Sequence, residues 1–95
     1  MDQTLTLSKP TLAFNVDTSK SHRASDSLIL FNAGSTARMG YKIKGNNIQR
    51  YIVNPASGVI DALETKKVDF IIRLRDDDEI SSINDRFRIF YVELT

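Results

Sequence analysis

The sequence contains no cysteine and no tryptophan, and its 95 residues include only two prolines, four glycines and one histidine. The lack of cysteine excludes a disulfide framework, a thiolate zinc site and a thiol nucleophile. Nothing points to an oxidising compartment, so the cytoplasm is the expected location. The 13 Lys and Arg residues nearly balance the 12 Asp and Glu residues, giving a formal net charge of +1. Recognition by charge therefore requires local clustering, and no overall field favours nucleic acid or anionic lipid.

Long hydrophobic runs are missing as well. The longest unbroken apolar stretches are residues 28–31 and 89–92, whereas a membrane span needs about 20 residues. The first residues lack the basic and then apolar order of a secretory signal. We therefore expect no direct membrane insertion, and the length fits one domain, residues 1–95.

What the sequence does contain is apolar residues at every second position, which is typical of β-strands. Residues 38–44 are the clearest case, because Met39, Tyr41 and Ile43 share one parity while both lysines take the other. The alternation predicts further strands at 5–7, 11–16, 49–54, 68–74 and 86–94. Residues 28–31 are apolar on both parities and predict a strand that is covered on both sides or lies near the centre of a sheet. Pro10 predicts that the first strand is a kinked edge strand that changes partner.

Turn-forming residues separate these strands and predict loops at 17–27, 32–35, 54–58 and 76–79. Gly45, Asn46 and Asn47 tolerate positive φ and predict a turn between two strands. Six or seven short strands at this spacing favour an all-β fold, an immunoglobulin-like β-sandwich. A small barrel is the alternative.

Catalytic and metal-binding motifs are not found in the sequence. His22 is the only histidine, so a catalytic triad cannot be assembled without it, and there is no nucleophile elbow or phosphate-binding glycine loop. The acidic run at 76–79 lacks the spacing of a calcium loop and is interpreted as a solvated connection. Phe14, Phe31, Phe70 and Phe87 lie at inward parity or in apolar runs, which argues against a base-stacking surface. We expect no enzyme activity, no cofactor, no metal and no nucleic-acid partner.

Residues 41–44 (Tyr-Lys-Ile-Lys), 50–53 (Arg-Tyr-Ile-Val) and 54–61 (Asn-Pro-Ala-Ser-Gly-Val-Ile-Asp) resemble the major sperm protein (MSP) domain family, which includes the VAMP-associated proteins. The resemblance extends from Leu5 to Ile89 and implies an immunoglobulin-like sandwich without cofactor or catalysis, used for protein contacts. In the sperm branch, such proteins polymerise into a motile cytoskeleton. In the adaptor branch, they bind peptides that carry phenylalanines in an acidic tract.

The resemblance also implies a peptide pocket. Lys42, Lys44 and Arg86 match its basic residues, Gly45 and Asn46 stand where the adaptors have paired threonines, and Arg88 replaces a methionine. Because the third and sixth strands of such sandwiches are neighbours, the outward-facing cations form one predicted patch. Its residues are Lys42, Lys44, Asn46, Arg86 and Arg88, with Arg50 nearby. The patch is interpreted either as a site for an acidic peptide or protein, or as a solubilising face.

The last strand is apolar on both faces at Phe90, Tyr91 and Val92. The resemblance implies one more strand after it, so its edge is expected to be unpaired and to recruit another strand. The alternatives are that the kinked first strand covers it or that the sequence is a shortened one. The preferred function is a self-associating cytoskeletal or scaffold protein, and hence a homo-oligomer. The alternative is an adaptor that reads acidic phenylalanine-containing peptides through the basic patch.

Overall fold

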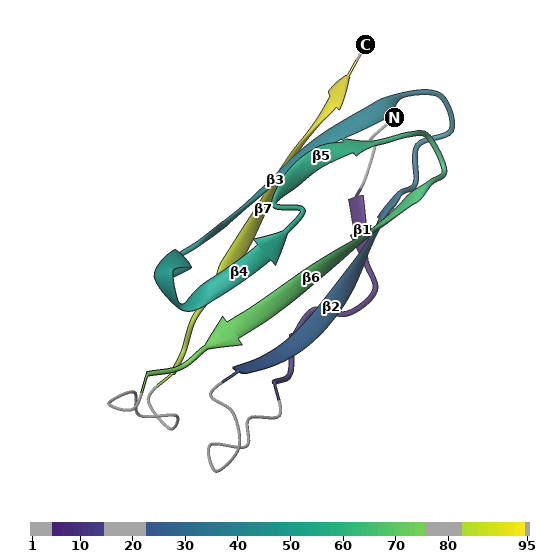
Figure 1. The fold of residues 1–95 in the computed structure, drawn as a ribbon. Helices are drawn as coiled ribbons and strands as arrows, with labels where there is room; N and C mark the ends of the chain where they lie inside the picture. The colour runs from purple at the N-terminus through teal and green to yellow at the C-terminus, as the bar shows by residue number, and fades with distance from the viewer. Residues whose placement is uncertain (1–4, 15–22, 76–82, 95) are drawn as a thin grey trace.

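A computed structural model describes residues 5–14, 23–75 and 83–94 (Figure 1). Within this part of the chain there are seven β-strands and one short 3₁₀ turn. They are β1 (Leu5–Leu7), β2 (Arg23–Asn32), β3 (Arg38–Gly45), η1 (Ile48–Arg50), β4 (Tyr51–Asn54), β5 (Ser57–Ile60), β6 (Thr65–Arg73) and β7 (Phe87–Leu94). The prediction of an all-β fold with six or seven strands is confirmed.

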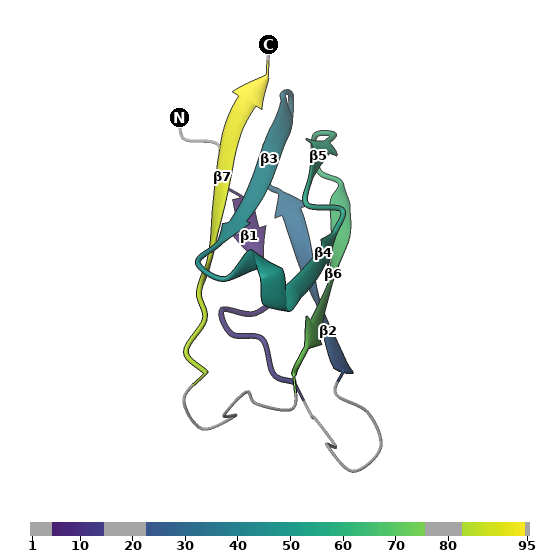
Figure 2. The ribbon, with the colours of Figure 1, turned by 60° about the vertical axis from the view of Figure 1, so that its left-hand side comes forward.

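The strands form two antiparallel sheets that pack face to face (Figures 1 and 2). One sheet has the order β1-β2-β6-β4, and the other has the order β5-β3-β7. Each sheet turns one face to the common core and the other to solvent, as in an immunoglobulin-like sandwich. β7 lies at the edge of its sheet, because within the described residues it pairs only with β3.

The alternation of apolar residues correctly predicts which side chains form the core. Met39, Tyr41 and Ile43 of β3 are buried while the intervening lysines are exposed. The same alternation holds along β6 and just beyond it. Successive strand residues point to opposite faces of a sheet, so one parity of each strand meets the facing sheet. The largest fully buried side chains are Phe70, Leu30, Met39, Ile60, Val68 and Asn32.

The loop predicted at 17–27 is wrong from residue 23 onward, where β2 begins. The ladder with β6 runs from Arg23 opposite Arg73 to Phe31 opposite Thr65. This long pairing outweighs the turn preference of the serines, which is a local property only. Residues 28–31 lie inside a sheet, as one of the two predicted alternatives has it, because β2 is flanked by β1 and β6. They are not covered on both faces, because Leu28 and Leu30 are buried but Ile29 is exposed on the outer face.

The strand predicted at 49–54 starts later, at Tyr51, because η1 occupies residues 48–50. The predicted loop at 54–58 is shorter than expected, since β5 begins at Ser57. Between these two strands the chain passes from one sheet to the other, with a cis bond between Asn54 and Pro55. Proline has no N–H to donate to a ladder, so the pairing of β4 with β6 ends at Asn54.

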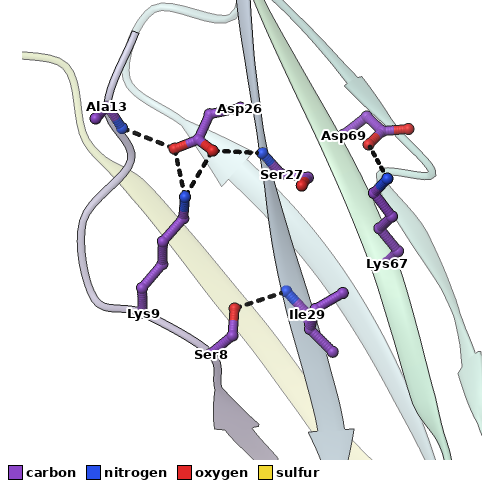
Figure 3. A network of polar contacts seen from close by, with 8 residues as sticks. All are labelled: Ser8, Lys9, Ala13, Asp26, Ser27, Ile29, Lys67 and Asp69. Atoms are coloured by element: carbon purple, nitrogen blue, oxygen red, sulfur yellow. Dashed lines mark hydrogen bonds and ion pairs between the residues drawn. The ribbon is translucent and has the colours of Figure 1, made fainter.

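The strand predicted after Pro10 is not formed in residues 11–14, so the predicted partner change there is wrong. Instead, side chains fasten this segment to β2 (Figure 3). Asp26 accepts hydrogen bonds from Lys9 Nζ at 2.6 Å and from the backbone N–H of Ala13 at 2.8 Å. Ser8 Oγ accepts the N–H of Ile29 at 2.9 Å. Residues 8–14 therefore lie along β2 without extending its sheet.

Asn32 is a fully buried polar residue at the end of β2. Its Nδ2 donates to the carbonyl oxygens of Ala37 and Ile60 at 2.9 and 3.0 Å, and its Oδ1 accepts the N–H of Gly34 at 2.9 Å. A buried amide is tolerated when its donors and acceptor are satisfied. Asn32 thereby ties β2 to the following loop and to β5. The predictions on Val16, His22 and residues 76–79 lie outside the described residues.

Candidate functional site

Cationic side chains of β3 and β7 meet on the outer face of the three-stranded sheet. Lys42 and Lys44 are exposed on β3, and Arg88 of β7 is the register partner of Lys44. Directly opposite residues of an antiparallel pair share a face, with Cβ atoms about 5 Å apart. The register therefore brings the β3 lysines and Arg88 together, as the alternation predicts.

Phe90 adds an aromatic ring to this cluster. It is the register partner of Lys42, and its ring centroid lies 5.8 Å from Nζ of Lys44. A cation within about 6 Å of a ring face is attracted by the ring's quadrupole. The contact orders the Lys44 side chain over an exposed aromatic surface, so this face offers both positive charge and apolar area.

Asn46 joins the turn after β3 to the residue before β7. The N–H of Arg86 donates to Asn46 Oδ1 at 3.0 Å, and the N–H of Asn46 donates to the Arg86 carbonyl at 3.1 Å. The turn forms without the positive φ expected at 45–47. Gly45 is needed for space instead, since a Cβ there would lie 3.0 Å from carbons of the Phe87 ring. Asn46 thus positions Arg86 at the end of the cluster.

These groups line a shallow surface hollow of about 400 Å³. We call it the basic hollow; its main side chains are Lys44, Asn46, Arg86, Phe87, Arg88 and Phe90. Lys42 lies beside it on β3. Like charges placed directly opposite each other in a sheet are destabilising, so Lys44 and Arg88 face each other at a cost that an anionic partner would relieve.

Arg50 lies outside the basic hollow. Its Nη1 donates to Asp85 Oδ2 at 2.7 Å, and the Tyr51 hydroxyl donates to the same oxygen at 2.7 Å. The Arg50 and Asp85 side chains are only 19% and 9% exposed. Burial, together with the Asp85 carboxylate, raises the pKa of Tyr51 well above its usual value. This cluster anchors the start of β4 to the segment before β7.

The free edge of β7 carries the second candidate site. Phe90, Tyr91 and Val92 are 47%, 48% and 60% exposed. Tyr91 shares the inward parity of Phe87 and Ile89, yet it is exposed because no described strand flanks β7 on its outer side. Three consecutive exposed apolar residues on a strand edge are a favourable contact surface for another chain.

The direction of the backbone groups on β7 follows from two backbone hydrogen bonds, one made by β3 and one by the turn after it. Ile43 N–H donates to Ala56 on the β5 side, while Asn46 N–H donates to Arg86 on the β7 side. In an antiparallel ladder, successive residues direct their N–H and C=O groups to alternate neighbours. Arg88, Phe90 and Val92 therefore bond to β3. The residues whose backbone groups point away from β3 are Phe87, Ile89, Tyr91 and Glu93.

An open apolar groove of about 530 Å³ lies between β7 and the 8–14 segment. We call it the side groove. Leu12 and Phe14 line it from the segment, Phe87 and Ile89 line it from β7, and Leu28 and Phe70 form its floor. The sandwich core is thus reachable from the side on which β7 has no strand partner in the described part of the chain.

The sequence analysis missed three contributors to these sites. Phe87 and Phe90 supply the apolar lining of the basic hollow, although the sequence suggested only a core residue and an edge residue. Asp85 was not singled out, because its pairing with Arg50 spans 35 positions in the sequence. The register of β3 with β7 was the one signal that pointed to Phe90, since it puts Phe90 opposite Lys42.

The described residues offer neither a metal site nor a membrane-spanning helix. No group of three or more His, Cys, Asp or Glu side chains in them is placed to hold a metal ion. In the described part of the chain, no helix is both long enough and apolar enough to cross a membrane.

The fold, the basic hollow and the free strand edge define an immunoglobulin-like sandwich whose exposed features suit contacts with other chains. A comparison with protein-family models matches residues 5–95 to the MSP (major sperm protein) domain. The chain therefore belongs to the MSP domain family, as the resemblance suggested. Members of this family serve as non-enzymatic domains for protein interaction or as scaffolds. A search of curated protein sequences finds no significant match.

Solved structures with the same fold include two nematode proteins. WR4, an MSP family member of Caenorhabditis elegans, aligns with a TM-score of 0.72 and 22% identity over 95% of this chain and 72% of its own. SSP-19, an MSP-domain-like protein of the same species, aligns with a TM-score of 0.62 and 22% identity over 75% of this chain and 61% of its own. At this identity the likeness shows the shared fold.

Proposed function

We propose that this chain is a self-associating scaffold or cytoskeletal protein of the cytoplasm, and that its copies join through the free edge of β7. The observation that carries the proposal is the exposure of Phe90, Tyr91 and Val92 on a strand whose outer backbone groups have no strand partner among the described residues. Association would remove apolar area from water and satisfy the edge N–H and C=O groups.

Sedimentation at rising protein concentration and at two salt levels tests this proposal. The mean mass should rise with concentration and persist in high salt, because apolar contacts and backbone bonds are weakly screened. Val92→Lys should keep the chain monomeric by placing a charge on the edge. Ile52→Lys is the matched control, since Ile52 is an exposed apolar residue on β4. A wild-type chain that stays monomeric throughout would overturn the proposal.

The basic hollow supports a second candidate function, the reading of acidic peptides that contain phenylalanine. Lys44, Arg86 and Arg88 would meet the carboxylates, and the Phe87 and Phe90 rings would contact the peptide's aromatic side chain. Hydrogen bonds between charged groups are worth about 1.5–3 kcal/mol each. The combination of opposed cations with exposed aromatic area favours a partner of this mixed chemistry over a purely anionic one.

Titration with a synthetic glutamate-rich peptide carrying one phenylalanine tests the second candidate. Lys44→Glu should weaken binding at least tenfold, and so should Arg86→Glu, while rising salt weakens the wild type. Lys67→Glu is the control, because Lys67 is an exposed lysine on β6 in the other sheet. Equal affinity of all three variants would show that the basic hollow is only a solvated face.

A further inference from the structure

We propose that a pocket lined by arginines, at one end of the four-stranded sheet, binds a phosphate dianion, either inorganic phosphate or the phosphate group of a small phosphomonoester. We call it the arginine pocket. It lies between η1 and the end of β6 and has a volume of about 140 Å³; its lining residues are Asn47, Gln49, Arg50, Arg73 and Arg75. The pocket shares no lining residue with the basic hollow and lies away from the free edge of β7.

Strand register explains why arginines converge at this place. On β2, Arg23 is the register partner of Arg73. On the other side of β6, the pairing with β4 begins at Tyr51 opposite Ile72, and Arg50 is the residue just before it. One arginine from each of three neighbouring segments therefore lies at the same level of the sheet (Figure 1). Like charges opposite each other in a sheet are destabilising, and a bound anion would offset that cost.

Arg73 is the central residue of the pocket. Its neighbours Ile72 and Leu74 are buried, so Arg73 and Arg75 point to the outer face of the sheet. Nη2 of Arg73 donates to the backbone carbonyl of Gln49 at 3.2 Å, which holds the guanidinium beside η1. A carbonyl has no net charge, and in the described part of the chain Arg73 has no carboxylate partner. Since a guanidinium has five N–H donors, Arg73 can bind an anion and keep its bond to Gln49.

Arg50 adds a second cation in a fixed position. Its Nη1 donates to Asp85 Oδ2 at 2.7 Å, and its side chain is 19% exposed. Asp85 also accepts the Tyr51 hydroxyl, so its carboxylate is held on the far side of Arg50 by two donors. None of the described residues that line the pocket is acidic, whereas three of them are arginines. The pocket therefore suits a ligand with more than one negative charge.

Size and charge together favour a phosphate group. The pocket volume is several times the roughly 30 Å³ that one water occupies in the liquid, so it has room for a group of about five heavy atoms. A phosphate monoester carries a charge of about −1.5 to −2 at pH 7, while a carboxylate carries one negative charge. The planar fork of a guanidinium also matches phosphate oxygens in a bidentate contact. Asn47 and Gln49 add side-chain amides to the lining.

Titration of the isotope-labelled chain with inorganic phosphate, followed by NMR at constant pH and ionic strength, tests the pocket. The backbone N–H signals of Asn47, Gln49 and Arg75 should shift and saturate. Acidic residues 76–79 follow Arg75 directly in the sequence, and phosphate could not enter if their carboxylates filled the pocket. The absence of a saturable shift, or a shift at Phe90 of the basic hollow with none at the pocket, would overturn the proposal.

A charge-neutralising variant tests the role of Arg73 against a matched control. Arg73→Gln should weaken phosphate binding at least tenfold, because it removes the central guanidinium. Lys67→Gln should leave the affinity unchanged, since Lys67 is an exposed cation on the same strand and the substitution removes the same charge. Equal weakening in the two variants would show that phosphate responds only to the net charge of the chain, and the pocket would then have no specific role.

Two further probes define the ligand. Acetate should bind at least tenfold more weakly than inorganic phosphate at the same ionic strength, because it carries a single charge. Tighter binding of glycerol 3-phosphate than of inorganic phosphate would identify a small phosphomonoester as the ligand, and the reverse order would identify free phosphate. Acetate that binds as tightly as both would show that the pocket does not select phosphate, and the proposal would be wrong.

Discussion

The two strands β2 and β7 carry similar apolar stretches, yet they differ in strand pairing and in burial. Residues 28–31 of β2 and residues 89–92 of β7 are the longest apolar runs of the sequence. β2 has β1 on one side and β6 on the other, and its Leu28 and Leu30 are 5% and 0% exposed. β7 pairs with β3 alone, and none of its residues is fully buried.

The difference shows that an apolar sequence is not enough for burial. The position of a strand in its sheet decides whether other described segments pack against it. The 8–14 segment, fastened by Asp26, lies beside β2 and completes its environment. No described segment does the same for the edge of β7. An apolar strand edge that the described residues leave uncovered is a natural place for another chain to bind.

Removal of side-chain volume from β2 and from β7 should have very different effects on stability. Leu30→Ala should lower the free energy of unfolding by about 2–5 kcal/mol, because it opens a cavity in a fully buried site. Val92→Ala should change it by less than about 0.5 kcal/mol at concentrations where the chain is monomeric. Denaturant unfolding measures both. Comparable losses in the two variants would mean that Val92 is buried in the monomer.

Asn32 should give the next largest effect. Asn32→Ala removes three hydrogen bonds at the end of β2. The buried Gly34 N–H and Ile60 carbonyl then lose their bonds to the Asn32 amide. Leaving a buried group unsatisfied costs about 1–3 kcal/mol, so we expect a loss of about 2–3 kcal/mol in denaturant unfolding. Asn54→Ala is the control, since Asn54 is exposed at the end of β4. Equal losses would mean that the amide network does not hold β2.

Asp26 should make the folded protein sensitive to acid. The hydrogen bond from Lys9, with those from the Ala13 and Ser27 N–H groups, lowers the pKa of Asp26 from 3.8 to about 2. A lowered pKa in the folded state means that this stabilisation is complete above pH 3.8 and is lost as the pH falls toward 2. Asp26→Asn should therefore flatten the pH dependence of the unfolding midpoint in that range.

Asp69→Asn provides the control for the acid profile. Asp69 is also a strand carboxylate, but its ion pair with Lys67 is exposed and 3.9 Å long. If Asp26→Asn leaves the slope between pH 4 and pH 2 as steep as in the wild type, the fastening of the 8–14 segment by Asp26 is wrong.

Leu63 should give the smallest effect, and in the opposite direction. It has a φ of 62°, a left-handed conformation that costs a side chain with a Cβ about 1–2 kcal/mol, and it is 57% exposed. Its N–H donates to the carbonyls of Asn32 and Gly34, so the turn supports the end of β2. Leu63→Asn should raise the free energy of unfolding by up to about 1 kcal/mol, because asparagine adopts this conformation readily. Leu63→Ala should bring no such gain in the same unfolding experiment.

Much of the fold could be predicted from the sequence, because alternation depends on local chemistry. The inward parity of Met39, Tyr41 and Ile43 and the outward parity of their lysines needed nothing else. The start of β2 at Arg23 could not be predicted, since only the ladder with β6 makes a strand of those polar residues. A change of strand partner was expected at Pro10, but residues 11–14 form no strand, and the chain instead passes between the sheets near Pro55. A proline in the sequence does not tell which partner the following residues find.

The residues of the candidate sites, too, could be predicted from the sequence only in part. Strand parity and the expected pairing of β3 with β7 were enough to group Lys42, Lys44 and Arg88. The separation of Arg50 from that group depends on Asp85, a contact between distant segments that no local pattern encodes. The aromatic half of the basic hollow was missed because Phe87 and Phe90 have opposite parities, and only the turn at Gly45 lets both reach the same surface feature.

Hydrogen exchange along β7, measured at low and high protein concentration, tests most directly whether its free edge joins two chains. The N–H groups of Arg88, Phe90 and Val92 bond to β3 and should be protected at both concentrations. The N–H groups of Ile89, Tyr91 and Glu93 point away from β3, and they should exchange quickly in dilute protein and gain at least tenfold protection in concentrated protein. Fast exchange of Ile89 and Tyr91 at every concentration would contradict the account.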